Sequence, residues 1–158
     1  MTTSQGSIEL LDTPVAQRLL ASTEYARLAY IGKDGMPRLI PMLFHWNGTE
    51  IVLPTFANSA KLRALRENPA VAITIDAAGP PPQVLQLRGH ADIDMQDGVV
   101  DEYELAHRRY YGDEQGRANV APLREAGVAQ ARIVLRPDWV GVIDFETRVP
   151  RAMAEAMS

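Results

Sequence analysis

The sequence contains no cysteine. This absence excludes disulfide bonds, thiol nucleophiles, thiolate-bound zinc and iron–sulfur clusters ligated by cysteine. Several catalytic and phosphate-binding patterns are missing as well: Gly-x-Ser-x-Gly, the Gly-Lys-Ser/Thr phosphate loop, His-Glu-x-x-His and Gly-x-Gly-x-x-Gly. The sequence therefore gives little support to hydrolase, nucleoside triphosphatase or Rossmann-type functions.

Metal-ligand clusters are also lacking. The three histidines, His45, His90 and His107, lie on separate predicted elements, and no carboxylate stands at ligand spacing from them. A metal ion needs several ligands brought to one point. We therefore predict no metal site and expect each imidazole to be structural or on the surface.

Long apolar runs are absent, and none approaches the roughly 18 residues that a membrane helix needs. The first seven residues lack the basic and apolar regions of a secretory signal, so we expect a cytoplasmic protein without membrane contact. A net charge of −4 argues against broad nucleic-acid binding. The length of 158 residues, with 46% hydrophobic and 23% charged residues, is typical of one globular domain.

Hydrophobic periodicity and turn residues predict a mostly antiparallel β protein with flanking helices. We expect tight turns at Asp34-Gly35 and Asn47-Gly48. The predicted helices cover 13–22, 59–67 and 97–111, the predicted strands cover 25–31, 37–46, 49–56, 70–76, 85–93, 132–136 and 140–145, and residues 112–130 are expected to be irregular or only partly helical. Six or seven strands in a chain of this length indicate a small barrel, with a disordered or extended segment over 1–12 and a tail over 149–158.

The predicted strand 37–46 is apolar on both faces. Ile40, Met42, Phe44 and Trp46 alternate with a second apolar set, Leu39, Pro41 and Leu43. A strand in a barrel wall that faces water should be apolar on one face only. The second face therefore needs a cover, which would be a second subunit, a flat apolar ligand, both of these, or a helix lying over the strand.

The segment 55–63 carries the chain from a strand end into a helix start. A helix start presents free N–H groups and a partial positive charge, and Lys61 would add a full one. The segment therefore fits a phosphate-sized anion, with further hydrogen bonds from Thr55, Asn58 and Ser59. Arg38, Arg63 and Arg66 would strengthen the positive field. The alternative, an ordinary capped helix with a solvated basic face, stays open on spacing alone.

Several short motifs follow one another in a definite order: Asp34-Gly35-x-Pro37, the strand 39–46, the segment 55–65 with Ser59-x-Lys61, then Glu67-Asn68-Pro69-x-Val71 and Leu87-x-Gly89-x-Ala91. In this order and spacing, over roughly residues 13–145, the chain resembles the pyridoxamine 5′-phosphate oxidase-like, split-barrel flavin-binding proteins. The resemblance implies a mainly β (α+β) fold, a six-stranded antiparallel split β-barrel with flanking helices. It also implies a flavin-binding domain over 13–148 and a homodimer with the cofactor at its interface.

The resemblance further implies FMN as cofactor, with the deazaflavin F-420 as the alternative. Ser59 and Lys61 would bind the phosphate, Thr55 would face the ribityl chain or the ring, and residues 41–44 (Pro41, Met42, Leu43 and Phe44) would line the isoalloxazine, partly through backbone groups. Arg88, or Trp139 from the second subunit, would complete the pocket. Residues 142–148 lack the C-terminal signature that binds the phosphorylated vitamin in the oxidase itself.

We therefore expect a flavin-dependent oxidoreductase other than pyridoxamine-phosphate oxidase, which transfers hydride to or from a small organic molecule. Because the cofactor carries the chemistry, no separate catalytic acid or base is required. Tyr110, Tyr111 and His45 are weak candidates for the substrate side of the ring. The alternative is a non-catalytic flavin- or haem-binding module or sensor of the same fold.

Overall fold

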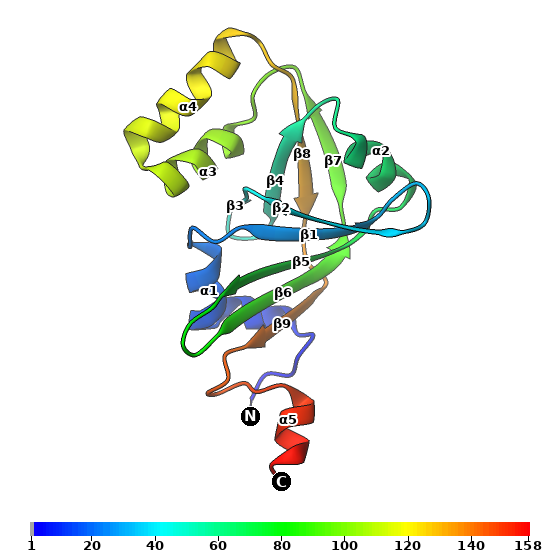
Figure 1. Ribbon diagram of the computed structural model, residues 1–158, viewed down its shortest axis with the longest axis vertical. Coiled ribbons are helices and arrows are strands. Elements are labelled where there is room, and N and C mark those ends of the chain that lie inside the picture. Colours follow the sequence, from blue (N-terminus) through cyan, green and yellow to red (C-terminus); the bar gives the residue numbers. More distant parts are fainter. Residues whose placement is uncertain (1) are drawn as a thin grey trace.

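The computed structural model describes residues 2–158 and consists of two antiparallel sheets with flanking helices (Figure 1). The strands are β1 (Ala26–Ile31), β2 (Pro37–Met42), β3 (His45–Trp46), β4 (Ile51–Phe56), β5 (Ala70–Ala77), β6 (Gln83–His90), β7 (Asp92–Gln96), β8 (Gln130–Leu135) and β9 (Trp139–Ile143). The helices are the 3-10 helix η1 (Ile8–Asp12), α1 (Pro14–Leu20), α2 (Ala60–Glu67), α3 (Asp101–Tyr111), α4 (Asp113–Glu125) and α5 (Arg151–Ala156). No helix in this described range is long and apolar enough to cross a membrane.

One sheet has the strand order β2-β1-β5-β6-β9 and the other the order β3-β4-β8-β7. The predicted mainly β, antiparallel split-barrel class is confirmed, but the chain has more strands than expected. Two predicted strands each break into two. The strand 37–46 divides into β2 and β3, and the strand 85–93 divides at Ala91 into β6 and β7. Each break moves the chain from one sheet to the other.

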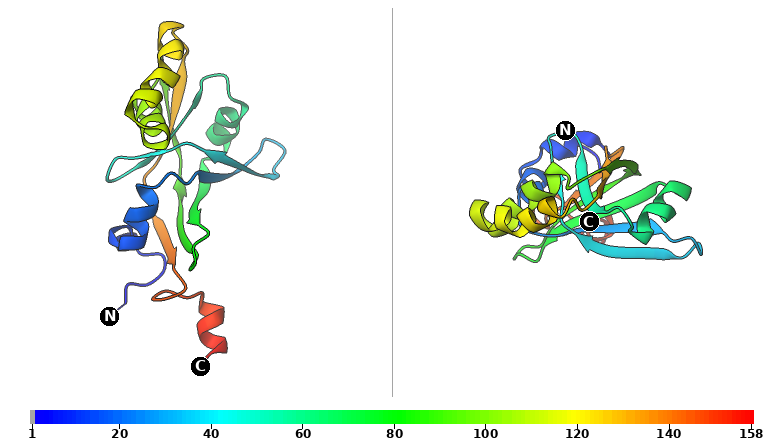
Figure 2. Two further views of the ribbon diagram at one scale, coloured as in Figure 1. Left: turned by 60° about the vertical axis from the view of Figure 1, so that its left-hand side comes forward. Right: turned by 90° about the horizontal axis from the view of Figure 1, so that it is seen from above.

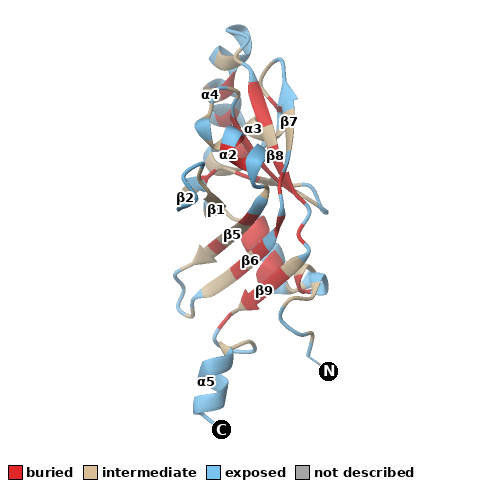
Figure 3. Ribbon diagram, turned by 90° about the vertical axis from the view of Figure 1, so that its right-hand side faces the viewer, coloured by how far each residue is buried: buried red, intermediate tan, exposed pale blue. Residues whose placement is uncertain are grey.

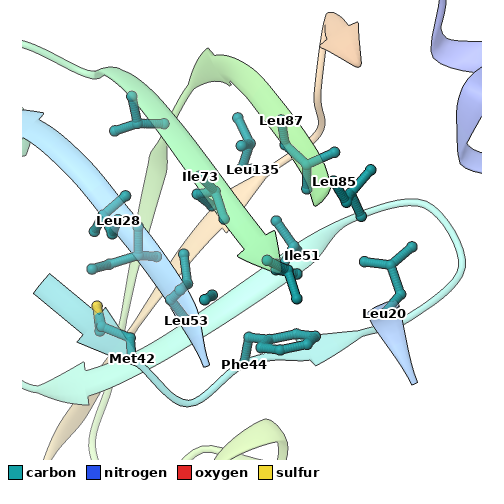
Figure 4. Close-up of a cluster of buried hydrophobic side chains, with 14 of the residues drawn as sticks. Leu20, Leu28, Met42, Phe44, Ile51, Leu53, Ile73, Leu85, Leu87 and Leu135 are labelled. Atoms are coloured by element: carbon teal, nitrogen blue, oxygen red, sulfur yellow. The ribbon is translucent and has the colours of Figure 1, made fainter. Parts of the chain in front are cut away.

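One hydrophobic core lies between the two sheets. Inward-pointing side chains of both sheets form this core, among them Ile73 and Leu87 of the five-stranded sheet and Leu53 and Leu135 of the four-stranded sheet. Figure 4 shows these side chains pointing into one cluster. Inward residues are buried, whereas alternate residues of β5 and β6 are half-buried or exposed. The predicted half-buried character of these strands is confirmed.

The break in the predicted strand 37–46 decides which apolar face is covered. Met42 and Phe44 are buried in the core, with exposures of 8% and 0%. Leu39 on the opposite face of β2 is 69% exposed. No helix therefore covers Leu39, and the predicted second apolar face lies open on the surface of this chain.

The N-terminal segment, expected to be disordered or extended over 1–12, contains a short helix in its second half. Residues 8–12 form η1, which buries Leu10 completely. Gln5 exchanges two hydrogen bonds with the backbone of Val142, at 2.5 and 2.9 Å, and the Gly6 N–H donates to the Val140 carbonyl at 2.8 Å. These contacts attach the segment to the edge of β9, which explains its order. The C-terminal residues 151–158 instead form α5 and its end, all exposed, and project away from the sheets (Figures 2 and 3).

Residues 113–125 form α4, where the sequence favoured irregular or partly helical structure. The interior Pro122 and Gly116 explain that expectation, because both residues disfavour helix. Tertiary packing overrides them. A Cβ added at Gly116 would lie 2.5 Å from the Arg108 Cα, so glycine lets α4 approach α3 closely. Arg124 also binds the Glu104 carboxylate of α3, at 3.1 Å.

Asp144 follows β9 and binds the turn that leads to α5. Its carboxylate accepts backbone N–H bonds from Glu146, Thr147 and Arg148 at 2.7–3.0 Å and the Thr147 hydroxyl at 2.6 Å. Burial raises the pKa of Asp144, but these hydrogen bonds outweigh it and lower the pKa to about 2. Because the folded-state pKa lies below the ordinary value, the stabilisation is present above about pH 4 and is lost as pH falls toward 2.

We therefore expect Asp144→Asn to lower the free energy of unfolding by about 2 kcal/mol near neutral pH. Urea unfolding of both proteins between pH 2 and 7 measures this difference. It should shrink as the pH falls toward 2, where the native carboxyl itself begins to take up its proton. A difference that does not change with pH would show that the hydrogen-bonded carboxylate is not the source of the stabilisation.

Candidate functional site

The candidate site lies where β4 passes into α2. Thr55 is the penultimate residue of β4, and Ser59 is the N-cap residue of α2. The turn between them is fixed by two backbone bonds: Ser59 N–H donates to the Phe56 carbonyl at 3.0 Å, and Ala57 N–H donates to the Ala129 carbonyl at 3.1 Å. The strand end and the helix start are therefore held in a defined relation.

The Lys61 ammonium group is the centre of this site. Its Nζ donates to the Ser59 hydroxyl at 2.7 Å and to the Thr55 hydroxyl at 3.1 Å. Burial lowers the pKa of Lys61, and no carboxylate lies within ion-pair distance of it among residues 2–158. The structure thus brings together three of the predicted cofactor-binding residues around a half-buried cation that has no counter-ion.

The start of α2 adds backbone donors to the same place. The Ser59 side chain does not cap the helix, and its hydroxyl accepts a hydrogen bond from Lys61. Within the described range, the N–H groups of Ala60 and Lys61 have no hydrogen-bond acceptor. Free N–H groups and the helix dipole both favour an anion at this end. These donors, the two hydroxyls and the ammonium group fit the phosphate of a bound cofactor.

Asn58 lies beside this cluster without joining it. Its side chain is exposed and lines a surface cavity of about 530 Å³ with Phe56, Ala57, Val128 and Ala129. No residue that lines this cavity belongs to the group formed by Thr55, Ser59 and Lys61. Its predicted role in binding stays a prediction.

The prediction for residues 41–44 needs correction for two side chains. Met42 and Phe44 point into the hydrophobic core (Figure 4) and so cannot line a cofactor ring with their side chains. Pro41 is exposed and Leu43 is half-buried, because alternate residues of an extended chain face opposite ways. The groups of this segment that could still contact a cofactor ring are Pro41, Leu43 and the backbone.

The three arginines expected to strengthen the positive field differ in their surroundings. Arg38 pairs with Asp34 at 2.8 Å, and the Arg66 guanidinium donates to the Met95 sulfur at 3.2 Å. Arg63 has no carboxylate partner in the described part of the chain and lines a cavity of about 280 Å³ between α2 and the β1–β2 hairpin. Of the three, Arg38 alone has a carboxylate partner in the described residues, and Arg63 is the uncompensated arginine nearer the start of α2.

Arg88 and Trp139 contact each other and not the Lys61 ammonium group of the same chain. The Arg88 guanidinium lies 3.8 Å from the centre of the Trp139 ring, a cation–π contact between β6 and β9. Trp139 packs closely against Gly6 and Gly141. The contribution of Arg88, or of Trp139 from a second subunit, to a cofactor pocket stays a prediction.

The last turn of α3 contains contacts that the sequence analysis missed. Arg109 donates to the carbonyl oxygens of Ser22 and Phe44, and Tyr110 donates to the carbonyl oxygen of Glu24. The weak candidate Tyr110 thus has a structural partner. His45 is half-buried, and burial, with the nearby Arg109 charge, lowers its pKa. The His107 ring also contacts the rings of Tyr103 and Tyr111. The i, i+4 spacing of these three residues is the one signal of these contacts that the sequence itself displays.

Comparison with known proteins identifies the family of this chain. A family model described as Pyridoxamine 5′-phosphate oxidase matches residues 13–142. Among solved structures, a protein named F-420 reductase is 26% identical, with a TM-score of 0.58 and coverage of 78% of this chain and 93% of that one. A conserved hypothetical protein from Mycobacterium tuberculosis is 22% identical, with a TM-score of 0.63 and coverage of 90% and 91%.

A haem-binding protein from Mycobacterium smegmatis has the same fold at 20% identity and a TM-score of 0.58, with coverage of 85% of this chain and 54% of that one. A search of curated protein sequences found no match. The family model covers most of the chain, from the start of α1 to within β9. This protein therefore belongs to the pyridoxamine 5′-phosphate oxidase family.

Proposed function

We propose that this chain binds FMN or F-420 and acts as an oxidoreductase that transfers hydride to or from a small organic substrate. The observation that carries the proposal is the half-buried Lys61 ammonium group, which has two hydroxyl partners and no carboxylate. Both cofactors carry a phosphate group, which these donors suit. The solved F-420 reductase at 26% identity supports the deazaflavin within this pair.

Each part of the proposed site has a definite task. Lys61, Ser59 and Thr55, with the free N–H groups of α2, would hold the phosphate. Pro41 and Leu43 would lie against the flat ring, and the bound ring would supply the hydride chemistry. The chain itself binds, orients and excludes water, so no catalytic acid or base is assigned. The missing C-terminal signature argues against oxidation of the phosphorylated vitamin.

We further propose that the protein works as a homodimer. Met36 and Leu39, on the hairpin that ends the five-stranded sheet, are 59% and 69% exposed. Pro37 and Pro41 flank Leu39 along this edge strand, and proline cannot donate a ladder hydrogen bond. The edge is therefore a poor template for strand addition. A second copy would instead cover the apolar side chains, which is one of the covers that the doubly apolar pattern of this segment allows.

A non-catalytic flavin- or haem-binding module is the second candidate. One observation favours haem: both ring nitrogens of His107 are buried without a hydrogen-bond partner among residues 2–158. Burial also lowers the pKa of His107, which favours the neutral imidazole that binds iron. The haem-binding neighbour shares the fold alone.

The test is a titration of the purified, cofactor-free protein with FMN, F-420 and haem, followed by absorbance or fluorescence. We expect saturable binding of FMN or F-420, and turnover when a reduced nicotinamide or a reduced deazaflavin is supplied as donor. Binding without turnover under any donor would favour the non-catalytic module. Binding of haem alone, lost in His107→Ala, would reject the oxidoreductase.

A further inference from the structure

The passage from β2 to β3 is a short stretch of chain that carries the polypeptide from one sheet to the other. β2 ends at Met42 in the five-stranded sheet, and β3 begins at His45 in the four-stranded sheet. Leu43 and Phe44 lie outside both ladders, so strand pairing does not fix their backbone. Something else must hold this stretch, which we call the sheet junction.

Arg109, near the end of α3, holds the sheet junction. Its Nη2 donates to the Phe44 carbonyl oxygen, and its Nε donates to the Ser22 carbonyl oxygen at 2.9 Å. Its guanidinium lies 4.5 Å from the centre of the Phe44 ring. Arg109 makes no ion pair among residues 2–158, so its charge acts on backbone carbonyl dipoles.

Tyr110 reinforces the same arrangement. Its hydroxyl donates to the Glu24 carbonyl oxygen, and its ring stacks on Tyr25 with centroids 5.4 Å apart. The end of α3 therefore forms hydrogen bonds with two segments that are distant from it in sequence, the α1–β1 connection and the sheet junction. α3 packs against α4 and contacts β3 and β4 (Figure 1), which supports the position of these side chains.

We propose that Arg109 is a positioning residue that fixes the sheet junction and so orients the ring of the cofactor. The inference rests on the proposed function, because it concerns the ring side of that site. A planar guanidinium can hold two carbonyl groups in one fixed geometry, which a lysine ammonium group cannot match. Small displacements of a positioning group have large effects on a bound ring. The α3–α4 hairpin would thus affect binding of the cofactor ring through the sheet junction and not through the phosphate.

The test separates ring binding from phosphate binding. The wild type, Arg109→Met and Lys61→Met are each titrated with FMN and with riboflavin, which lacks the phosphate. If F-420 is the cofactor, the ligand pair is F-420 and its phosphate-free deazaflavin chromophore. We expect Arg109→Met to weaken both ligands by the same factor, about tenfold or more, and to shift the absorption band of the bound ring. Lys61→Met should weaken only the phosphate-bearing ligand.

Arg108→Met is the matched control, because Arg108 is the neighbouring residue but pairs with Asp113 at 3.0 Å. It should bind both ligands as the wild type does. If Arg109→Met does not fold, as judged by urea unfolding, Arg109→Lys replaces it and should show a smaller loss for both ligands. Wild-type affinity and an unshifted band in the folded variant would overturn the positioning role, as would a loss confined to FMN. A wild type that binds neither FMN nor F-420 would overturn the proposed function itself.

Discussion

Lys61→Ala is expected to weaken binding of the phosphate-bearing cofactor by about 1.5–3 kcal/mol, or about 10- to 150-fold in Kd. The variant removes a half-buried ammonium group whose partners are the hydroxyls of Ser59 and Thr55. Because no carboxylate depends on this charge within the described residues, the fold should be little affected. Titration by absorbance or fluorescence measures the affinity, and urea unfolding checks the stability.

Lys33→Ala is the matched control, since Lys33 is the only other lysine in the chain. It pairs with Glu67 at 3.2 Å, at the opposite end of α2 from Lys61, and both side chains are more than half exposed. Exposed ion pairs contribute little to stability. We expect this variant to bind the cofactor as the wild type does. Equal losses in both variants would indicate a general charge effect and reject the specific phosphate site.

Phe44→Ala is expected to lower the free energy of unfolding by about 3–5 kcal/mol, the usual cost of removing a large buried aromatic side chain. Phe44 is fully buried and belongs to the core shared by both sheets (Figure 4). The truncation leaves a cavity that the surrounding β strands cannot close completely. Urea denaturation, with the midpoint and the slope fitted separately, measures the loss.

Phe56→Ala is the comparison, because Phe56 is 43% exposed at the end of β4. Its truncation should cost much less stability. The pair also tests whether the Phe44 side chain lies in the core. If the Phe44 side chain lined the cofactor ring instead of the core, Phe44→Ala would reduce ring affinity and leave the unfolding midpoint near the wild-type value.

Much of the phosphate site could be predicted from sequence because it is local. Thr55, Ser59 and Lys61 lie within one strand end and the first turn of the next helix, so short-range geometry brings them together. Strand alternation and turn chemistry were equally informative. Gly35 and Gly48 adopt positive φ values of 78° and 101° in the predicted turns, where glycine is favoured.

Other features depended on contacts between distant segments. The α4 helix forms despite Pro122 because Gly116 and Arg124 pack against α3. Arg109 meets Phe44 across 65 positions of sequence and Ser22 across 87 positions. No periodicity or motif encodes such a pairing, because it arises only when the sheets and helices have assembled.

The sequence by itself determined the antiparallel β class, the family resemblance and the residues proposed to bind a phosphate, since each rests on alternation, turn residues or neighbouring positions. The tertiary structure decided where the strand 37–46 breaks, which of its side chains enter the core, and what holds the sheet junction. Alternation can show that two faces are apolar, but only the packing of both sheets selects the face that is buried. The family resemblance accordingly assigns residues 41–44 to the cofactor ring, partly through backbone groups, while the structure places the Met42 and Phe44 side chains in the core.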